Sequence, residues 1–403
     1  MRKLNYLQLA YITGSALGVP GMIIGGVLAK ELGTGIALSS IFIGNLLLWL
    51  IGLAIIFMSD FKNHALENVQ GYLGKPAALL ASIILGIAFL VWYAIQIQEV
   101  TSAIHFAIHT QADWAIGVGL GLLITCVSLG GIRSLNAICR ISLPLLLAIS
   151  VYVIFTSKQG ILLPTHWGIS LIGIVSVIFT WLPYTINLPT FFCHAKTRSD
   201  TVLGLSVMSC LHMFFQSSLV FADVYEFKML FLNYSGSNNL INNSVVLMFF
   251  FMSFFCVNLI NIYFASACWA TLFPKCRPVT GYLLTGFFGT CIYLVQQGFT
   301  VLETVSFPAE WWTSILATPI AILGIVLLVD FLIRRIAKHR PRPWGRFWSS
   351  FSWFAGSVVA TAMQLFVTSS SNVPLISGLC TSLFIFLVVI FVEETIWSVK
   401  TLN

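Results

Sequence analysis

Charged side chains are scarce in this sequence. Only 8% of its 403 residues are Asp, Glu, Lys or Arg, whereas 58% are hydrophobic and 14% are aromatic. An average soluble domain contains about 25% charged residues, because its surface has to be compatible with water. The composition therefore excludes a soluble globular protein and indicates that lipid surrounds most of the chain.

Metal-binding and redox motifs are also missing. The nine Cys include no C-x-x-C pair, and the seven His form no H-E-x-x-H pattern. These absences argue against a zinc site, a redox centre and a disulfide-stabilised secreted fold. His105 and His212 are the two histidines that we expect to be buried, and they lie in separate apolar runs. An intramembrane enzyme is therefore only a remote alternative, and no cofactor is predicted.

Long apolar runs dominate what is present. Twelve runs are long enough to cross a bilayer, which takes roughly 17–25 residues, and their continuous apolarity excludes the alternating pattern of a membrane barrel. The sequence thus predicts an all-α, multi-pass integral membrane protein. The predicted transmembrane helices cover residues 7–29, 34–58, 77–106, 114–131, 138–156, 168–193, 201–222, 244–270, 279–297, 312–333, 350–368 and 374–392.

The positive charges indicate an orientation. If the N-terminus lies in the cytoplasm, seventeen of the twenty Lys and Arg residues fall on the cytoplasmic side, as positively charged loops prefer. Twelve helices then return the C-terminus to the same side, and we expect a bacterial inner membrane. The densest basic run, 334–346, is interpreted as a loop that faces anionic lipid rather than as a nucleic-acid site.

Two of the predicted helices contain residues that interrupt a helix. The first carries the glycine-rich segment Gly14–Gly21, and the sixth carries Thr180–Pro183 with Pro189 six residues later. Because Pro removes a backbone donor and Gly relaxes the helix, both runs favour unwound segments. Breaks at corresponding positions of two halves are typical of inverted-repeat transporters. We expect a first repeat at 1–156, a second at 157–335, and two appended helices at 336–403.

Polar side chains recur on two predicted helices. Trp92, Gln96 and Glu99 follow an i, i+4, i+7 spacing, so they share one face of the third helix. Glu99 is interpreted as facing a cavity, as protonated, or as lying near the outer interface. Gln96 either joins helices or faces a site. Asn258 and Asn261 of the eighth helix either hydrogen-bond to neighbouring helices or face the same central cavity, and the sequence favours neither alternative.

Several motifs resemble the nucleobase:cation symporter-1 family, whose members carry cytosine, purines, allantoin and hydantoins. The run Trp181–Phe191, continued by Ala195 and Lys196, is similar to the family's W-x5-N-x-P-D-F motif, and Trp92–Gln96 is similar to its W-[FY]-G-[IV]-Q motif. Further matches are Gly44-Asn45, the Asn258 region, and the run from Pro319 through Gly324 to Asp330, Phe331, Arg334 and Arg335. They follow the family's order from about residue 35 to 335.

The resemblance implies a leucine-transporter-type fold with inverted five-helix repeats. It also implies that Trp92 and Trp181 enclose a planar heterocycle, while Gln96 and Asn258 bind its amide edge. Gly18, in the first interruption, is the remaining substrate-binding candidate. Stacking on an aromatic ring is worth roughly 1–3 kcal/mol and tolerates many planar molecules, whereas buried amides select among them.

One departure concerns the coupling ion. In sodium-coupled members, a Ser/Thr pair before the eighth-helix Asn supplies oxygen ligands, but Cys256 and Val257 stand at those positions here. A thiol and an isopropyl group do not replace oxygen ligands for sodium. Sodium is therefore not expected, and a proton carried by Glu99 is a candidate alternative. The family's Asp and Arg after the sixth-helix proline are also replaced, by Thr190 and Cys193.

The sequence thus predicts a permease that imports a nucleobase or a related planar heterocycle by alternating access. An amino-acid permease of the same fold is the alternative, in which the Gly14–Gly21 segment holds a carboxylate. The expected partners are this small molecule and membrane lipid, without nucleic acid.

Overall fold

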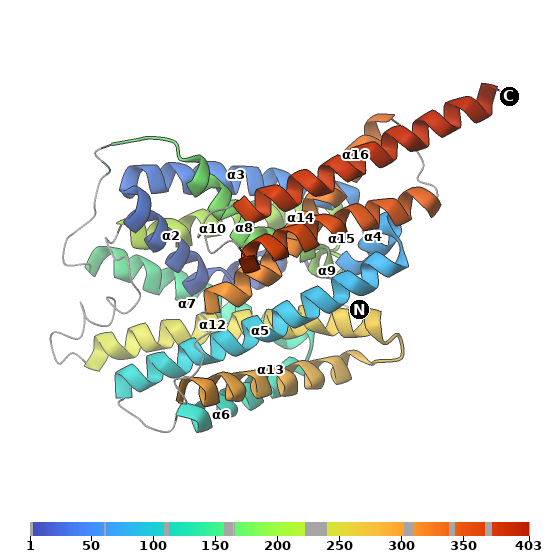
Figure 1. Ribbon diagram of the computed structural model, residues 1–403. Helices are drawn as coiled ribbons and strands as arrows, with labels where there is room; N and C mark the ends of the chain where they lie inside the picture. The colour runs from blue at the N-terminus through green and yellow to red at the C-terminus, as the bar shows by residue number, and fades with distance from the viewer. Residues whose placement is uncertain are drawn as a thin grey trace.

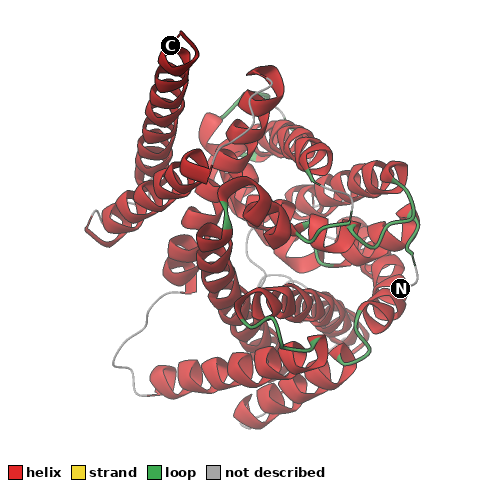
Figure 2. Cartoon of the chain, turned by 90° about the vertical axis from the view of Figure 1, so that its right-hand side faces the viewer, coloured by secondary structure: helices red, strands yellow, loops and turns green. Residues whose placement is uncertain are grey.

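Helices make up the regular structure of this protein. The computed structural model describes residues 3–59, 62–108, 113–156, 164, 166–221, 240–301, 309–337, 343–366 and 373–402. Within these ranges we find no β-sheet, which confirms the predicted all-α class (Figures 1 and 2). The helices are α1 (Tyr6–Ser15), α2 (Gly18–Leu32), α3 (Thr34–Met58), α4 (Ala65–Leu73), α5 (Lys75–Ile108), α6 (Asp113–Ser128), α7 (Ile132–Thr156), α8 (Leu171–Asn187), α9 (Pro189–Phe192), α10 (Arg198–Phe221), α12 (Leu240–Leu272), α13 (Pro278–Val301), α14 (Ala309–Ala337), α15 (Pro343–Phe366) and α16 (Val373–Leu402).

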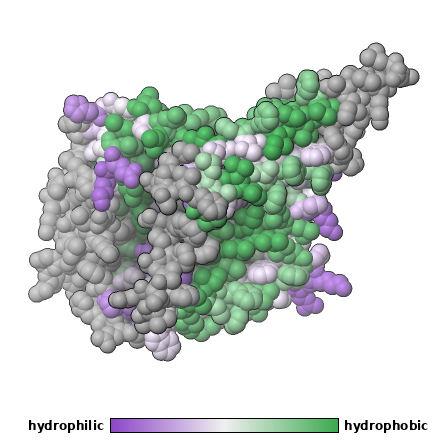
Figure 3. Space-filling model, in the orientation of Figure 1, coloured by the Kyte–Doolittle hydropathy of each residue, from purple (hydrophilic) through white to green (hydrophobic). Residues whose placement is uncertain are grey.

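Most of these helices are long and apolar enough to cross a membrane. Among the described residues nine helices qualify singly, and α1 and α2 qualify together as a bent pair. The predicted spans at 114–131 and 350–368 coincide with α6 and α15, which are outside this set, so the count of twelve stays a prediction. Apolar side chains cover much of the surface between the two ends of the bundle, as Figure 3 shows. The chain is a multi-pass integral membrane protein.

The first predicted break is confirmed. Helices α1 and α2 meet at an angle of 57°, with Ala16 as the C-cap of α1 and Leu17 as the N-cap of α2. Pro20 lies in the first turn of α2, where its missing N–H disrupts no helical hydrogen bond. Gly18 allows α2 to begin directly against α12, because a Cβ at Gly18 would lie 2.8 Å from Oγ of Ser253.

The second break lies at the end of the predicted run. Helix α8 continues through Pro183 and ends at Asn187, and Pro189 then begins the short helix α9. The predicted interruption of this helix is confirmed at the Pro189 end of the run, whereas the segment Thr180–Pro183 is itself helical. The Nδ2 of Asn187, the last residue of α8, donates to the carbonyl of Pro183 (2.8 Å). The carbonyl that loses its helical donor at Pro183 is that of Phe179, four residues earlier. Pro189 suits a first helical position, so the new helix starts there.

The chain ends lie toward the same end of the bundle (Figure 1). Here Leu4 donates to the carbonyl of His194 (2.8 Å) and accepts from the N–H of Lys196 (2.8 Å), which ties the first residues to the segment between α9 and α10. The guanidinium of Arg198 donates to the carbonyls of Ile56 (3.1 Å) and Ser59 (3.3 Å) at the end of α3. Hydrogen bonds therefore join the first residues, the segment between α9 and α10, and the end of α3 to one another.

Candidate functional site

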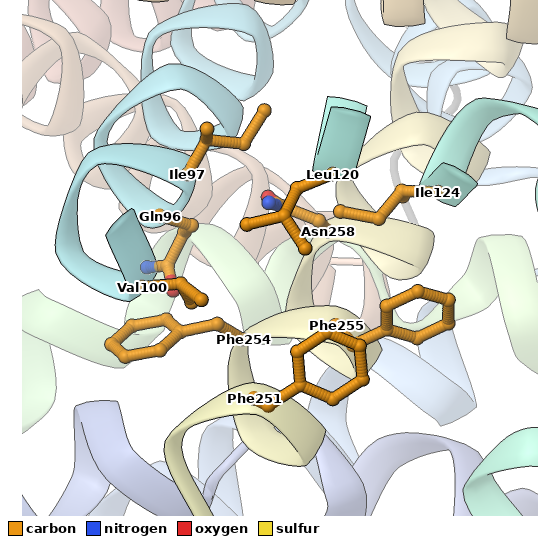
Figure 4. Close-up of a pocket in the computed structure, with 9 residues that line it drawn as sticks. All are labelled: Gln96, Ile97, Val100, Leu120, Ile124, Phe251, Phe254, Phe255 and Asn258. Atoms are coloured by element: carbon orange, nitrogen blue, oxygen red, sulfur yellow. The ribbon is translucent and has the colours of Figure 1, made fainter. Parts of the chain in front are cut away.

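Gln96 lies in a small pocket between three helices (Figure 4). Its side chain is only 3% exposed, and its Oε1 has no hydrogen-bond partner. The pocket has a volume of about 10 Å³. A buried carbonyl without a partner is costly, so this atom is prepared for a donor that the protein alone does not supply. The lining residues are Gln96, Ile97 and Val100 of α5, Leu120 and Ile124 of α6, and Phe251, Phe254, Phe255 and Asn258 of α12.

Asn258 combines both roles that the sequence left open. It lines the pocket with Gln96, and its Nδ2 also donates to the backbone carbonyl of Tyr93 on α5 (3.4 Å). The Nδ2 of Asn261, one turn later on α12, donates to Oδ1 of Asn258 (3.3 Å). Tyr93 is held in turn by donating its hydroxyl to the carbonyl of Gly121 on α6 (2.9 Å). The amide of Asn258 is therefore held in place in the wall of the same pocket that Gln96 lines.

The two predicted aromatic walls differ in their surroundings. Trp181 of α8 is 8% exposed, its Nε1 has no partner, and its ring meets those of Tyr184 and His212 edge-on. Trp92 is half-buried on α5, four residues before Gln96 and so on the same face. Among the ring contacts of the described residues none joins Trp92 to Trp181. That these indoles enclose one ligand stays a prediction.

A polar cluster that sequence analysis missed lies behind Trp181. We define this α10 cluster as His212, Gln216 and Asn45, each at most 1% exposed. The Nδ2 of Asn45 donates to Oε1 of Gln216 (2.6 Å), and the imidazole of His212 lies against Trp181 with ring centroids 4.3 Å apart. Nε2 of His212, Nε2 of Gln216 and Oδ1 of Asn45 have no partner. The signal in the sequence is the i, i+4 pair of polar residues on an apolar helix.

The remaining predicted residues are placed differently. Gly18 packs against Ser253, whose Oγ accepts the N–H of Val19 (2.8 Å). Glu99 is exposed, so burial of its carboxyl, on which the proton-carrier hypothesis depended, is not found. His105, expected to be buried, is exposed as well and is paired with Asp113 (3.1 Å).

At the position expected for a cation, a thiol lies among hydroxyl groups, because the side chain of Cys256 contacts those of Ser15 and Ser142. Cys256 is fully buried against the thiol of Cys139, and Val257 is half-buried. The nearby hydroxyl of Ser253 already accepts a backbone N–H from α2. In the part of the chain that the structure describes, no three His, Cys, Asp or Glu side chains are grouped as metal ligands. That sodium is not the coupling ion stays a prediction, which rests on Cys256 and Val257 standing where oxygen ligands are expected.

Comparisons with known proteins identify similar folds without similar sequences. No family model matches the chain, and no curated protein sequence does. Mhp1, a nucleobase-cation-symport-1 family transporter, in a closed conformation with bromovinylhydantoin bound, has a TM-score of 0.66 and 14% identity over 98% of this chain and 94% of its own.

Two further solved structures cover similar shares. A Na⁺-coupled sialic acid symporter in a substrate-bound outward-open state has a TM-score of 0.67 and 11% identity over 96% of this chain and 90% of its own. A manganese transporter of Eremococcus coleocola has a TM-score of 0.60 and 14% identity over 98% and 94% of the two chains. This protein therefore has the leucine-transporter-type fold that the motifs implied.

Proposed function

We propose that this protein is a secondary transporter that imports a nucleobase or a related planar heterocycle by alternating access. The observation that carries the proposal is the buried carbonyl of Gln96, which lacks a partner and lines the same pocket as the amide of Asn258. A planar heterocycle with an N–H on its edge supplies the missing donor. The fold supports a transporter because the solved structures that it resembles are named as transporters.

Aromatic rings supply the other half of the recognition. Trp92 lies one turn from Gln96 on α5, and Trp181 of α8 is braced by His212. An indole stacks with any planar base, which gives affinity without strong selection. The amides of Gln96 and Asn258 then discriminate, because an analogue that leaves Gln96 unpaired loses roughly 1–3 kcal/mol.

The closed pocket is consistent with a transport cycle. Pockets that hold small molecules usually measure about 300–1,000 Å³, whereas the space beside Gln96 has a volume of about 10 Å³, which is room for about one water molecule. A heterocycle enters only when the surrounding helices move. The bend of 57° between α1 and α2 and the interruption at Leu188 are places where the helices are already discontinuous, so we expect the movement there.

An amino-acid permease, the alternative, finds less support in α2. Its first turn has to bind a carboxylate through free N–H groups. However, the N–H of Val19 is given to Ser253, Pro20 has no N–H, and the N–H of Gly21 bonds the carbonyl of Leu17. These groups are therefore not available to a carboxylate.

Uptake by the purified full chain in proteoliposomes tests the proposal. Vesicles loaded with unlabelled compound are given labelled cytosine, uracil, hypoxanthine, hydantoin or tryptophan, and exchange is measured. We expect saturable exchange of at least one heterocycle and none of tryptophan. Exchange of tryptophan or other zwitterionic amino acids alone contradicts the proposal, as does the absence of any exchange by protein that binds these compounds.

A further inference from the structure

His212 is unusual among the ionisable residues of this protein. Of the Asp, Glu, His, Lys and Arg side chains in the described ranges, those classed as buried are His194, His212 and Asp330. His194 lies outside the membrane-spanning helices, and Asp330 lies inside the span Ile315–Ile333, three residues from its end. His212, at 1% exposure, lies well inside the span of α10. It is therefore the buried imidazole of the membrane-embedded core.

The imidazole touches a wall of the proposed substrate site. Its ring lies edge-on to Trp181, with centroids 4.3 Å apart and planes inclined by 80°. Protonation of His212 changes its interaction energy with this indole, because a positively charged imidazolium is attracted to the face of an aromatic ring. Movement of Trp181 on ligand binding likewise alters the surroundings of His212. The ring contact thus links the two positions.

The ionisable residues of the helices around His212 are few. Helix α2 contains no ionisable residue before Lys30, and α3 contains none at all over Thr34–Met58. Helix α8 contributes only Tyr184, which meets Trp181. Helices α1 and α7 also pack against α10. The ionisable residues of α1 are Tyr6 and Tyr11. Those of α7 are Arg133, Cys139, Arg140 and Tyr152. On α10 itself the other ionisable residues are Arg198, Asp200 and Cys210.

The α10 cluster also leaves polar atoms ready for an additional hydrogen. Nε2 of His212 has no hydrogen-bond partner. Oδ1 of Asn45, whose Nδ2 donates to Gln216 in the same cluster, has none either. A core histidine with a structural role normally hydrogen-bonds both ring nitrogens, since an unpaired buried polar atom is costly. An atom left open at this depth is a functional-site candidate.

We propose that His212 binds and releases the coupling proton of this transporter. The inference rests on the proposed heterocycle transport. A proton from water on the side of substrate entry forms an N–H bond at Nε2 of His212, and the same bond breaks when the proton returns to water on the opposite side. Trp181 couples the two events in this proposal, because it contacts His212 and is one of the two indoles proposed to stack on the substrate. His212 replaces Glu99 in this role.

Proton entry driven by substrate provides the test. The full chain is reconstituted without sodium, with a pH dye inside, and an inward proton gradient of one unit is applied. One-to-one coupling then supports up to about tenfold accumulation of a neutral heterocycle, equivalent to about 1.4 kcal/mol. We expect the wild-type protein to accumulate substrate and to acidify the lumen, and His212→Gln to do neither while it still exchanges labelled for unlabelled substrate.

Controls separate this proposal from the proposed function. His105→Gln makes the same change at an exposed histidine and should behave as wild type. Glu99→Gln should keep substrate-driven acidification, and its loss there would overturn the proposal even if His212→Gln failed to fold. Acidification retained by His212→Gln or His212→Asn, or absent from a wild-type protein that exchanges heterocycle, also overturns it. Absence of heterocycle exchange in wild type contradicts the proposed function instead.

Discussion

The indole of Trp181 rests edge-on against the imidazole of His212, with the two ring centroids 4.3 Å apart. This arrangement is one of those that aromatic pairs prefer, and it joins α8 to α10 in the interior of the bundle. A second edge-on contact, between Trp181 and Tyr184, holds the indole from within its own helix. The orientation of Trp181 is thus set before any ligand binds, which lowers the cost of binding.

Removal of the stacking surface on α5 should weaken binding. We expect Trp92→Ala to raise the Kd for a heterocycle by roughly five- to 150-fold, since stacking of a base contributes about 1–3 kcal/mol. Equilibrium binding to detergent-purified protein measures this change. Trp114→Ala, which removes a 63% exposed indole from α6, is the matched control and should leave Kd unchanged. Wild-type affinity in Trp92→Ala would place the aromatic wall elsewhere.

Loss of the Gln96 amide should alter selectivity more than folding. Gln96→Leu keeps the approximate shape but removes the carbonyl, and we expect binding to weaken by about 1–3 kcal/mol, or roughly five- to 150-fold. Gln98→Leu, two residues later on another face of α5, is the control. Competition by analogues with and without a ring N–H provides the measurement. If Gln96→Leu ranks the analogues as wild type does, Gln96 has no part in selection.

Transport should not depend on sodium. Replacement of sodium by choline is expected to leave uptake unchanged, because Cys256 and Val257 present no oxygen ligands. The double variant Cys256→Ser, Val257→Thr supplies two hydroxyl groups, and we expect its uptake to become stimulated by sodium. Initial rates in proteoliposomes at constant pH report both effects. A fall in wild-type uptake on sodium removal would disprove sodium independence.

The close approach of α2 to α10 predicts a strict requirement for glycine. A Cβ at Gly25 would overlap the backbone carbonyl oxygen of Gln216, which is not a flexible side-chain atom. Gly25→Ala should therefore lower stability by about 1–3 kcal/mol. Gly71→Ala is the opposite case: no atom lies within 4 Å of its added Cβ on α4, so it should stabilise by up to about 1 kcal/mol. Thermal unfolding in detergent distinguishes them, and equal midpoints would contradict this packing.

Acid should destabilise the end of the bundle at which α9 and α10 meet. Burial, and secondarily the nearby His64, lower the pKa of His194 from 6.5 to about 4, and its Nε2 bonds the hydroxyl of Tyr263 (2.6 Å). Between these two values the unfolded chain binds a proton that the folded chain does not, so stability falls as pH falls from about 6.5 toward 4. At pH 5 the loss from this group is about 2 kcal/mol.

The pH dependence of thermal unfolding checks this expectation. His194→Gln should flatten the decline between pH 7 and 5 relative to wild type. His166→Gln, at an exposed histidine, should not. Parallel curves for wild type and His194→Gln would show that the neutral imidazole is not responsible.

Local patterns in the sequence predicted much of the architecture but marked one break too broadly. The glycine-rich segment correctly marked the bend at Ala16 and Leu17, because nothing else in the first run favours an interruption. The run from Thr180 to Pro189 marked the second break, and only its Pro189 end is interrupted. Pro183 removes the hydrogen bond to the carbonyl of Phe179, four residues earlier, yet α8, which packs against α3 and α14, continues past it.

The sequence by itself determined the solvent, the helical class and the candidate amides, since apolar length and the cost of a polar group in lipid depend only on residue type and spacing. The tertiary structure alone decided which polar residues meet. Gln216 and Asn45 are 171 positions apart yet share a hydrogen bond, and His212 reaches Trp181 from a different helix. Such contacts arise when helices pack face to face, and their geometry is not contained in the periodicity of either helix.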